Sequence, residues 1–251
     1  MERPHPIISL PPGLTAIGID GCKGRWLLVS LTHDGLDVHL YDQIEEICEH
    51  YAAADAMLID MPVGLPESPL EIRPESALRK KLKGRASTVF NVPCRQAVQE
   101  TEYAAASSVN YEVLGKRLSR QSFGILPQIR EIDNFLQMEP SWKNRLMESH
   151  PEYCFALLNN GRPIVSNKRT PEGEAARIKL LMRYFPTTQA LIIRFHDKYP
   201  GSRSKTDDLL DALVLAVIGA AGLRNGFHTL PDTVNEDSRG IRMQIVGTDL
   251  V

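Results

Sequence analysis

Two short apolar segments, each ending in an aspartate, restrict the fold of this chain more than any other feature. Residues 15–20 and 56–60 have the composition of buried strands and end at Asp20 and Asp60. Ligands bind at the carboxyl edge of a parallel sheet, where neighbouring strands lie about 4.8 Å apart. Two carboxylates about 4 Å apart repel by about 4 kcal/mol at an effective dielectric constant of 20. Such a pair needs a cation or a shared proton, although either aspartate alone is equally typical of a turn cap.

The segments around these strands predict an α/β fold. Residues 26–31 and 36–41 are strand-like and residues 43–54 have helical spacing, so the order is strand, strand, strand, helix, strand. Residues 145–149 are a candidate fifth strand. The length of 251 residues suits one large domain. We therefore expect a single domain over residues 1–251.

The segment 62–142 differs from its surroundings, because it combines prolines, helical stretches and a basic cluster. No Gly/Ser-rich linker separates it from the rest. We expect a mainly helical insertion between the fourth and fifth strands. Further along the chain, residues 172–184 and 207–223 predict helices, and residues 240–246 predict an edge strand. Residues 191–195 fit either a strand or the end of a helix.

The helix predicted at 207–223 carries three acids near its start. Asp207 and Asp208, after Thr206 as a cap, favour the positive end of the helix dipole and need no ligand. Asp211 is surrounded by apolar residues, and a buried carboxylate is costly unless it is paired or bound to a metal. Asp208 and Asp207 each share a helix face with Asp211, at i, i+3 and i, i+4. We favour Asp208 together with Asp211, with Asp207 as the alternative ligand.

A fourth acid, Glu152, follows the fifth strand in the tripeptide at 150–152. A solvated loop position explains it equally well. The candidate ligands are all oxygens, which suit Mg²⁺ or Mn²⁺ rather than zinc. We expect a pair of such ions held by Asp20, Asp60, Asp207, Asp208 and Asp211. We expect catalysis to involve Asp20, Asp60, Glu152, Asp208 and Asp211, with His150 as an accessory residue.

Basic residues gather in two places. The segment 73–85 has six cations against the single acid Glu75, and a smaller cluster surrounds Lys168. A solvated face explains such a run about as well as phosphate binding does. Hydroxyl groups next to the first cluster are typical contacts of phosphates or base edges. The candidate nucleic-acid contacts are Arg79, Lys80, Lys83, Arg85, Ser87, Lys168 and Arg169.

Seven short motifs occur in order along the chain. They are residues 18–22 with Trp26, 59–65, 85–90 with Pro93, 129–133, 150–152 with Phe155, 167–173, and 207–212. In these motifs, from about residue 16 to residue 220, the chain resembles the family of predicted ribonuclease-H-like nucleases called domain of unknown function 429. The resemblance implies a ribonuclease-H-like mixed five-stranded sheet flanked by helices, and a nuclease activity. Arg25 and Glu75 depart from the glycine and aspartate that this family usually has at the corresponding positions.

We therefore predict metal-dependent phosphodiester hydrolysis of nucleic acid, in which Asp20 bridges two ions that activate water and stabilise the leaving oxygen. The net charge of −2 excludes coating of nucleic acid by bulk charge, but it conceals separate acidic and basic clusters. Two alternatives stay open. One is a non-catalytic nucleic-acid-binding or interaction module on the same fold. The other is an ATP-binding phosphotransfer relative, although such proteins normally repeat this fold twice.

The expected compartment is the cytoplasm. The four cysteines are widely spaced, which disfavours a zinc site and a disulfide framework. Residues 1–13 lack the apolar core of a signal peptide, and the apolar run 212–223 is too short to span a bilayer. We expect nucleic acid as the partner and no membrane association. The choice between DNA and RNA, and the formation of a homodimer, stay open.

Overall fold

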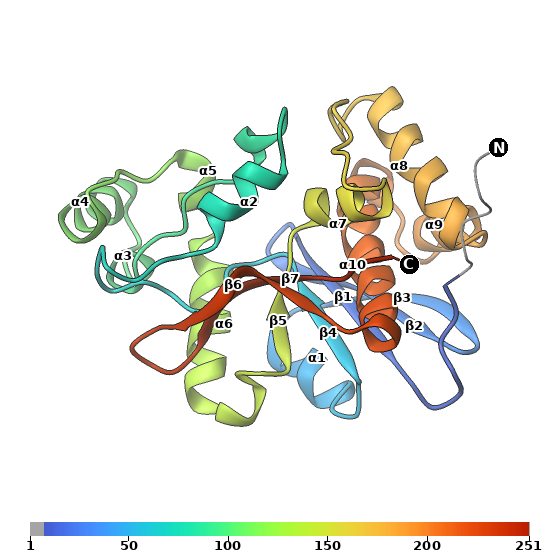
Figure 1. Cartoon of the computed structure of the whole chain (residues 1–251), viewed down its shortest axis with the longest axis horizontal. Coiled ribbons are helices and arrows are strands. Elements are labelled where there is room, and N and C mark those ends of the chain that lie inside the picture. Colours follow the sequence, from blue (N-terminus) through green and yellow to red (C-terminus); the bar gives the residue numbers. More distant parts are fainter. Residues whose placement is uncertain (1–7, 251) are drawn as a thin grey trace.

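A five-stranded mixed sheet forms the centre of the molecule (Figure 1). The computed structural model describes residues 8–250, without the side chains of residues 203 and 204. The strand order is β3-β2-β1-β4-β5, from strands β1 (Ala16–Cys22), β2 (Arg25–Thr32), β3 (Gly35–Tyr41), β4 (Ala56–Ile59) and β5 (Leu146–Glu148). The first three strands pair antiparallel, whereas β4 runs parallel to both β1 and β5. This arrangement confirms the predicted ribonuclease-H-like sheet.

Alternation along the strands assigns their side chains to two faces of the sheet. On β1, Ile17 and Ile19 join one hydrophobic cluster, whereas Ala16 joins the other. On β4, Ile59 joins the same cluster as Ile17 and Ile19, whereas Leu58 joins the cluster that contains Ala16. The sheet is therefore covered on both sides, as expected for strands that are apolar along their whole length.

Helices α1 (Ile44–His50) and α6 (Leu126–Met138) cover the face that carries Ile17 and Ile19. The apolar stripe of α6 includes Ile129, Ile132 and Leu136, which are all fully buried. Because α6 belongs to the segment 62–142, the end of the predicted insertion is part of the core.

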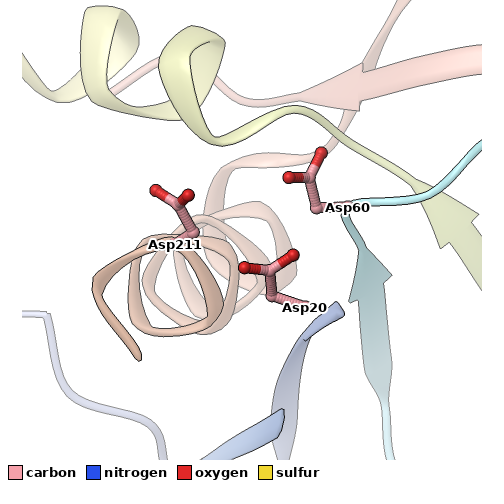
Figure 2. Close-up of side chains that lie close together, drawn as sticks. All are labelled: Asp20, Asp60 and Asp211. Atoms are coloured by element: carbon pink, nitrogen blue, oxygen red, sulfur yellow. The ribbon is translucent and has the colours of Figure 1, made fainter. Parts of the chain in front are cut away.

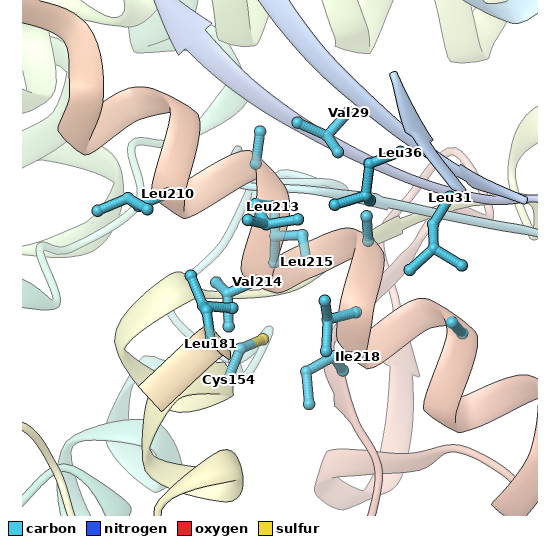
Figure 3. Close-up of a cluster of buried hydrophobic side chains, with 14 of the residues drawn as sticks. Val29, Leu31, Leu36, Cys154, Leu181, Leu210, Leu213, Val214, Leu215 and Ile218 are labelled. Carbon is cyan, nitrogen blue, oxygen red and sulfur yellow. The ribbon is translucent and has the colours of Figure 1, made fainter. Parts of the chain in front are cut away.

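Helix α10 (Thr206–Asn225) lies across the opposite face, and α7 (Pro151–Leu158), α8 (Pro171–Tyr184) and α9 (Thr188–Lys198) pack around it. Figure 3 shows Leu213 and Val214 of α10 among side chains from β2 and α8. The helix is buried on nearly all sides, which explains its almost continuous apolar sequence. Within residues 8–250, no helix has the length and apolarity needed to cross a bilayer. Residues 1–7 of the N-terminal segment 1–13 lie outside this range.

The segment between β4 and β5 is mainly helical, as predicted. Its elements are α2 (Glu75–Lys81), η1 (Ala86–Thr88), α3 (Arg95–Val98), α4 (Tyr103–Leu114), α5 (Arg120–Gly124), α6 and η2 (Pro140–Trp142). In Figure 1, α2 to α5 (teal to green, left) and α7 to α9 (yellow to orange, right) lie on opposite sides of the view.

The end of the chain forms a separate hairpin of β6 (His228–Glu236) and β7 (Arg242–Gly247). The strand predicted at 240–246 is therefore paired with β6 and is not an edge strand of the main sheet. Strand β6 was not predicted, because Pro231 and several polar residues interrupt its alternation. The ambiguous residues 191–195 lie within helix α9.

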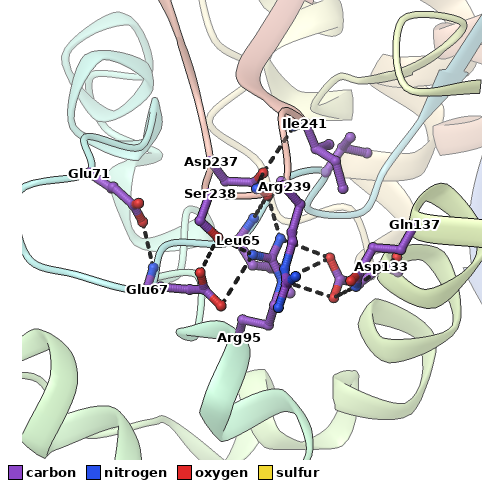
Figure 4. Close-up of polar contacts among 12 residues, drawn as sticks. Leu65, Glu67, Glu71, Arg95, Asp133, Gln137, Asp237, Ser238, Arg239 and Ile241 are labelled. Carbon is purple, nitrogen blue, oxygen red and sulfur yellow. Dashed lines mark hydrogen bonds and ion pairs between the residues drawn. The ribbon is translucent and has the colours of Figure 1, made fainter. Parts of the chain in front are cut away.

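A buried arginine connects the helical insertion to this hairpin (Figure 4). Arg95 of α3 forms ion pairs with Asp133 of α6 at 3.1 Å, with Asp237 at 2.5 Å and with Glu67 at 3.5 Å. Asp237 also accepts the backbone N–H groups of Leu65 and Ile241. Since a buried charge is tolerated only when it is paired, this network fixes the insertion against the hairpin.

Candidate metal centre

Three aspartates meet at the carboxyl edge of the sheet (Figure 2). Asp20 lies near the end of β1, Asp60 directly follows β4, and Asp211 lies in the second turn of α10. Each offers a carboxylate oxygen, and the three oxygens lie within 4.8 Å of one another. Asp20 and Asp211 are buried, and Asp60 is partly buried. The structure thus brings together three of the predicted ligands from three distant parts of the chain.

The close approach of α10 to β1 explains this convergence. Gly18 lies two residues before Asp20, and alternation places both on the face covered by α10. A Cβ atom at Gly18 would lie 2.0 Å from the carbonyl oxygen of Ala212 and 2.4 Å from the backbone nitrogen of Ala216. Only glycine permits this backbone contact. The contact brings the first turns of α10, and with them Asp211, to the end of β1.

The charges of the three aspartates are poorly compensated. Burial, followed by the charges of Asp60 and Asp211, raises the pKa of Asp20 well above its usual value. Burial and the charge of Asp211 raise the pKa of Asp60 to about 8. Burial also raises the pKa of Asp211 to about 6, although Lys168 opposes this shift. A cluster whose members all ionise less readily than isolated aspartates is a candidate for cation binding.

Lys168, in the loop before α8, supplies a cation to this cluster. Its Nζ forms an ion pair and a hydrogen bond with Asp211. The charges of Asp211 and Asp20 raise the pKa of Lys168 despite its burial, so it is fully protonated at neutral pH. We predicted Lys168 as a phosphate contact, and the structure places it directly beside the carboxylates.

Asp208 and Asp207, the other two acids of α10, do not take the ligand positions that we predicted for them. Asp208 forms an ion pair with Lys205 at 3.1 Å, and it lines the cavity next to Asp20 and Asp60. Asp207 is 3.7 Å from the exposed Arg169. Neither belongs to the group of three oxygens described above. The i, i+3 spacing places Asp208 near Asp211 on the helix, but of these two acids it is Asp211 that joins Asp20 and Asp60 in the group of three oxygens.

Glu152 is held by two arginines. Its Oε1 accepts hydrogen bonds from Arg85 at 2.9 Å and from Arg177 at 2.7 Å. Its Oε2 is buried and has no hydrogen-bond partner within the part of the chain described. The charge of Glu152 raises the pKa values of Asp60 and Asp211, so Glu152 lies close to the cluster without belonging to it.

His150, predicted as an accessory residue, lines the same cavity as Asp20 and Asp60. Burial lowers the pKa of His150 to about 4, so its ring is neutral at pH 7. A neutral imidazole can accept or donate a proton, but it adds no positive charge to the site.

Glu148 is an acid of this edge that we did not predict. It ends β5, and β5 lies parallel to β4 with Glu148 opposite Ile59. Its carboxylate accepts two hydrogen bonds from Arg73 and one from the backbone of Val63, all at 2.8 Å. Burial raises the pKa of Glu148 to about 7. Its position at the end of a short apolar strand is the same signal that identified Asp20 and Asp60.

Around the two predicted basic clusters, some side chains are held by partners within the protein and others are exposed. Arg73 and Arg85 bind Glu148 and Glu152, and Arg79 donates to Val89 and to Asn91. Lys80, Lys83, Ser87 and Arg169 are exposed. Helix α2 ends at Lys81, so Lys83 lies outside the helix that carries Arg79.

These donors fit a hard divalent cation. Three carboxylates offer only oxygens, and these oxygens converge from rigid elements of the fold. One lysine cannot neutralise three carboxylates. The three carboxylates could therefore hold a divalent cation, and Mg²⁺ or Mn²⁺ stays a prediction.

The model of one protein family, described as "Protein of unknown function (DUF429)", matches residues 18–236. The chain belongs to the DUF429 family. This match confirms the family that the seven motifs indicated, and it includes all three aspartates of the cluster. No curated protein and no solved structure matches the chain. Membership of DUF429 by itself assigns no activity.

The raised pKa values predict how the stability of this DUF429 protein depends on pH. The pKa of Asp60 is about 8 when folded and about 3.9 when unfolded, so the folded state binds more protons between these values. The free energy of unfolding of the metal-free protein therefore falls as pH rises toward 8. Glu148, with a pKa of about 7, acts in the same direction. His150 opposes this trend only below pH 6.5, because its pKa is lowered.

Thermal unfolding in a chelator between pH 6.5 and pH 8 measures this effect, and the Tm is expected to fall. Mn²⁺ at 100 times its Kd is expected to restore about 2.7 kcal/mol, which corresponds to roughly 5–10 °C in Tm. Asp60→Asn is expected to reduce both the pH dependence and the response to metal. A metal-free Tm that does not change over this range would contradict the prediction.

Proposed function

We propose that this protein is a divalent-metal-dependent phosphodiesterase that hydrolyses nucleic acid. One observation carries the proposal. The carboxylates of Asp20, Asp60 and Asp211 converge at the carboxyl edge of a ribonuclease-H-like sheet. Bound divalent ions would supply an activated water and stabilisation of the leaving oxygen.

The chain's own residues have distinct roles in this proposal. In Figure 2 the three carboxylates form a triangle, and an oxygen of Asp20 lies within 4.8 Å of an oxygen of each of the other two, so Asp20 could share ligation with both. Lys168 holds the carboxylate of Asp211 and has the charge to contact a phosphate oxygen nearby. Arg85 and Arg177 hold Glu152, which fixes the start of α7 beside the cluster. The exposed Lys80 and Lys83 offer charge for a longer strand of nucleic acid.

Cleavage assays on a panel of substrates test the proposal. Labelled single-stranded DNA, single-stranded RNA, their duplexes and an RNA–DNA hybrid are incubated with purified protein in Mg²⁺, in Mn²⁺ and in a chelator. We expect cleavage of at least one substrate in the presence of metal and none in the chelator. Cleavage that persists in the chelator would show that the carboxylate cluster is not its source.

The same panel separates the alternatives. Tight, metal-independent binding without cleavage of any substrate would favour a nucleic-acid-binding module. Binding of ATP with release of phosphate would favour the phosphotransfer relatives of this fold. The three converging acids support the metal-dependent proposal, because a module that only binds nucleic acid has no need for three carboxylates, two of them buried, next to its ligand.

A further inference from the structure

The cavity beside the carboxylates has an apolar wall. Its volume is about 250 Å³, and it lies between the carboxyl edge of the sheet and the helical insertion. Leu78 of α2 and Val89, Phe90 and Val92 after η1 line the side formed by the insertion. Leu78, Val89 and Val92 are buried, whereas Phe90 is partly exposed. An apolar wall gains nothing from contact with a phosphate, but it matches the face of a planar, uncharged ring.

Two amide side chains line the same cavity. Gln121 belongs to α5 and is exposed, and Gln128 belongs to α6 and is partly buried. The Nε2 of Gln128 donates to the carbonyl of Arg25 at 3.3 Å, which holds the side chain against β2. Amides present both donors and acceptors, as the edges of nucleobases do. The insertion therefore supplies the apolar and amide groups together with Glu75, whereas the other carboxylates come from the sheet edge and from α10.

The net negative charge of the cavity lies at the end formed by the aspartates, and the other end is apolar. Glu75 and Glu148 are both paired with Arg73, and Asp208 is paired with Lys205. Lys168 offsets only part of the charge of the aspartate cluster, so the remaining negative charge in the cavity is that of this cluster. A phosphate can approach this end only together with a divalent cation, while the apolar end accepts an uncharged group without one.

We propose that this cavity holds one unstacked nucleobase beside the metal centre, so that the substrate is single-stranded nucleic acid or a frayed end. The inference rests on the proposed function and specifies its substrate class. A base within an intact duplex is stacked and paired, and its entry into the cavity costs a few kcal/mol of unstacking. A single strand avoids this cost, and Phe90 provides the ring on which its base stacks.

Binding of small ligands tests the cavity without turnover. A nucleoside 5′-monophosphate and ribose 5-phosphate carry the same phosphomonoester, and they differ in the base. Titration calorimetry in Mn²⁺ is expected to show at least about tenfold tighter binding of the nucleotide, as base stacking predicts. Equal Kd values for the two ligands would overturn the proposal, and this comparison requires no variant.

Two variants test whether the tighter binding of the nucleotide arises in this cavity. Phe90→Ala is expected to remove most of the difference between the two ligands. Leu70→Ala is the matched control, because Leu70 is an 86% exposed apolar residue of the same insertion outside the cavity lining, and it should leave the difference unchanged. Thermal unfolding of both variants checks that they are folded. If Phe90→Ala is folded and retains the full preference for the nucleotide, the cavity is not the base site.

Cleavage assays distinguish this inference from the function on which it rests. We expect a single-stranded oligonucleotide to be cut at least about tenfold faster than the same strand in a blunt duplex. Metal-dependent cleavage of both forms at one rate would overturn the base cavity and leave the nuclease proposal intact. Base-dependent nucleotide binding without cleavage of any polymer would support the cavity and reject the nuclease.

Discussion

Asp20→Asn is expected to reduce the rate of metal-dependent cleavage by about 10³-fold or more. Asp20 lies within reach of both Asp60 and Asp211, and asparagine retains the shape of the side chain while removing its charge. Loss of metal-derived charge stabilisation is worth several kcal/mol in the transition state, and each 1.36 kcal/mol corresponds to tenfold in rate. The measurement is the single-turnover rate on the best substrate of the panel in Mn²⁺.

Stability distinguishes loss of function from loss of fold in this variant. Because the pKa of Asp20 is raised, its ionised form is unfavourable in the metal-free protein. Asp20→Asn is therefore expected to have at least the parental Tm in a chelator, and a smaller increase in Tm on addition of Mn²⁺. Asp197→Asn removes the same charge from an exposed position of α9 and serves as the control. A cleavage rate above one tenth of the parental value in Asp20→Asn would exclude this centre as the active site.

Gly18→Ala is expected to lower the free energy of unfolding by about 3 kcal/mol or more. The new methyl group would lie within 2.4 Å of two backbone atoms of α10, and backbone cannot rotate away as a flexible side chain can. Helix α10 would have to move outward, which would carry Asp211 away from Asp20. Since a displacement of about 1 Å costs about 10²-fold in rate, we also expect a loss of cleavage. Denaturant unfolding and cleavage assays on the same protein measure both effects.

Gly219 provides a matched control on the same helix–sheet interface. A Cβ atom there would lie 3.5 Å from the Cβ of Ala16, which is an ordinary packing distance. Gly219→Ala is therefore expected to be neutral, or stabilising by up to about 1 kcal/mol through helix propensity. If both glycine variants had the same stability, the close contact at Gly18 would not be what positions α10.

Local sequence patterns predicted those site residues that can be recognised within a single strand or helix. Asp20 and Asp60 end apolar strands, and Asp211 interrupts an apolar helix, so each is unusual within its own segment. The register of β1 and β4, with Ile19 opposite Ile59, then brings the two strand ends together. These features required no knowledge of distant contacts.

Partners far apart in the sequence were not predictable in this way. Arg85 was expected to contact phosphate, but it binds Glu152, which lies 67 positions later. Arg73 binds Glu148 across 75 positions. A charged residue has the same local pattern whether it faces solvent or a buried partner. Glu148 was missed although residues 145–149 were predicted as a strand, because that prediction ended one residue after Glu148, whereas β5 ends at Glu148 itself.

The position of Asp211 late in the chain has a consequence for biosynthesis. Asp20 and Asp60 are synthesised early. Helix α10 begins only at Thr206, and the hairpin to which Arg95 is bound through Asp237 begins at His228. The sheet edge thus lacks its third carboxylate until more than four fifths of the chain has been made. A nascent chain at that stage also lacks the helix that buries one face of the sheet, so the last step of folding would both close the core and complete the acidic cluster.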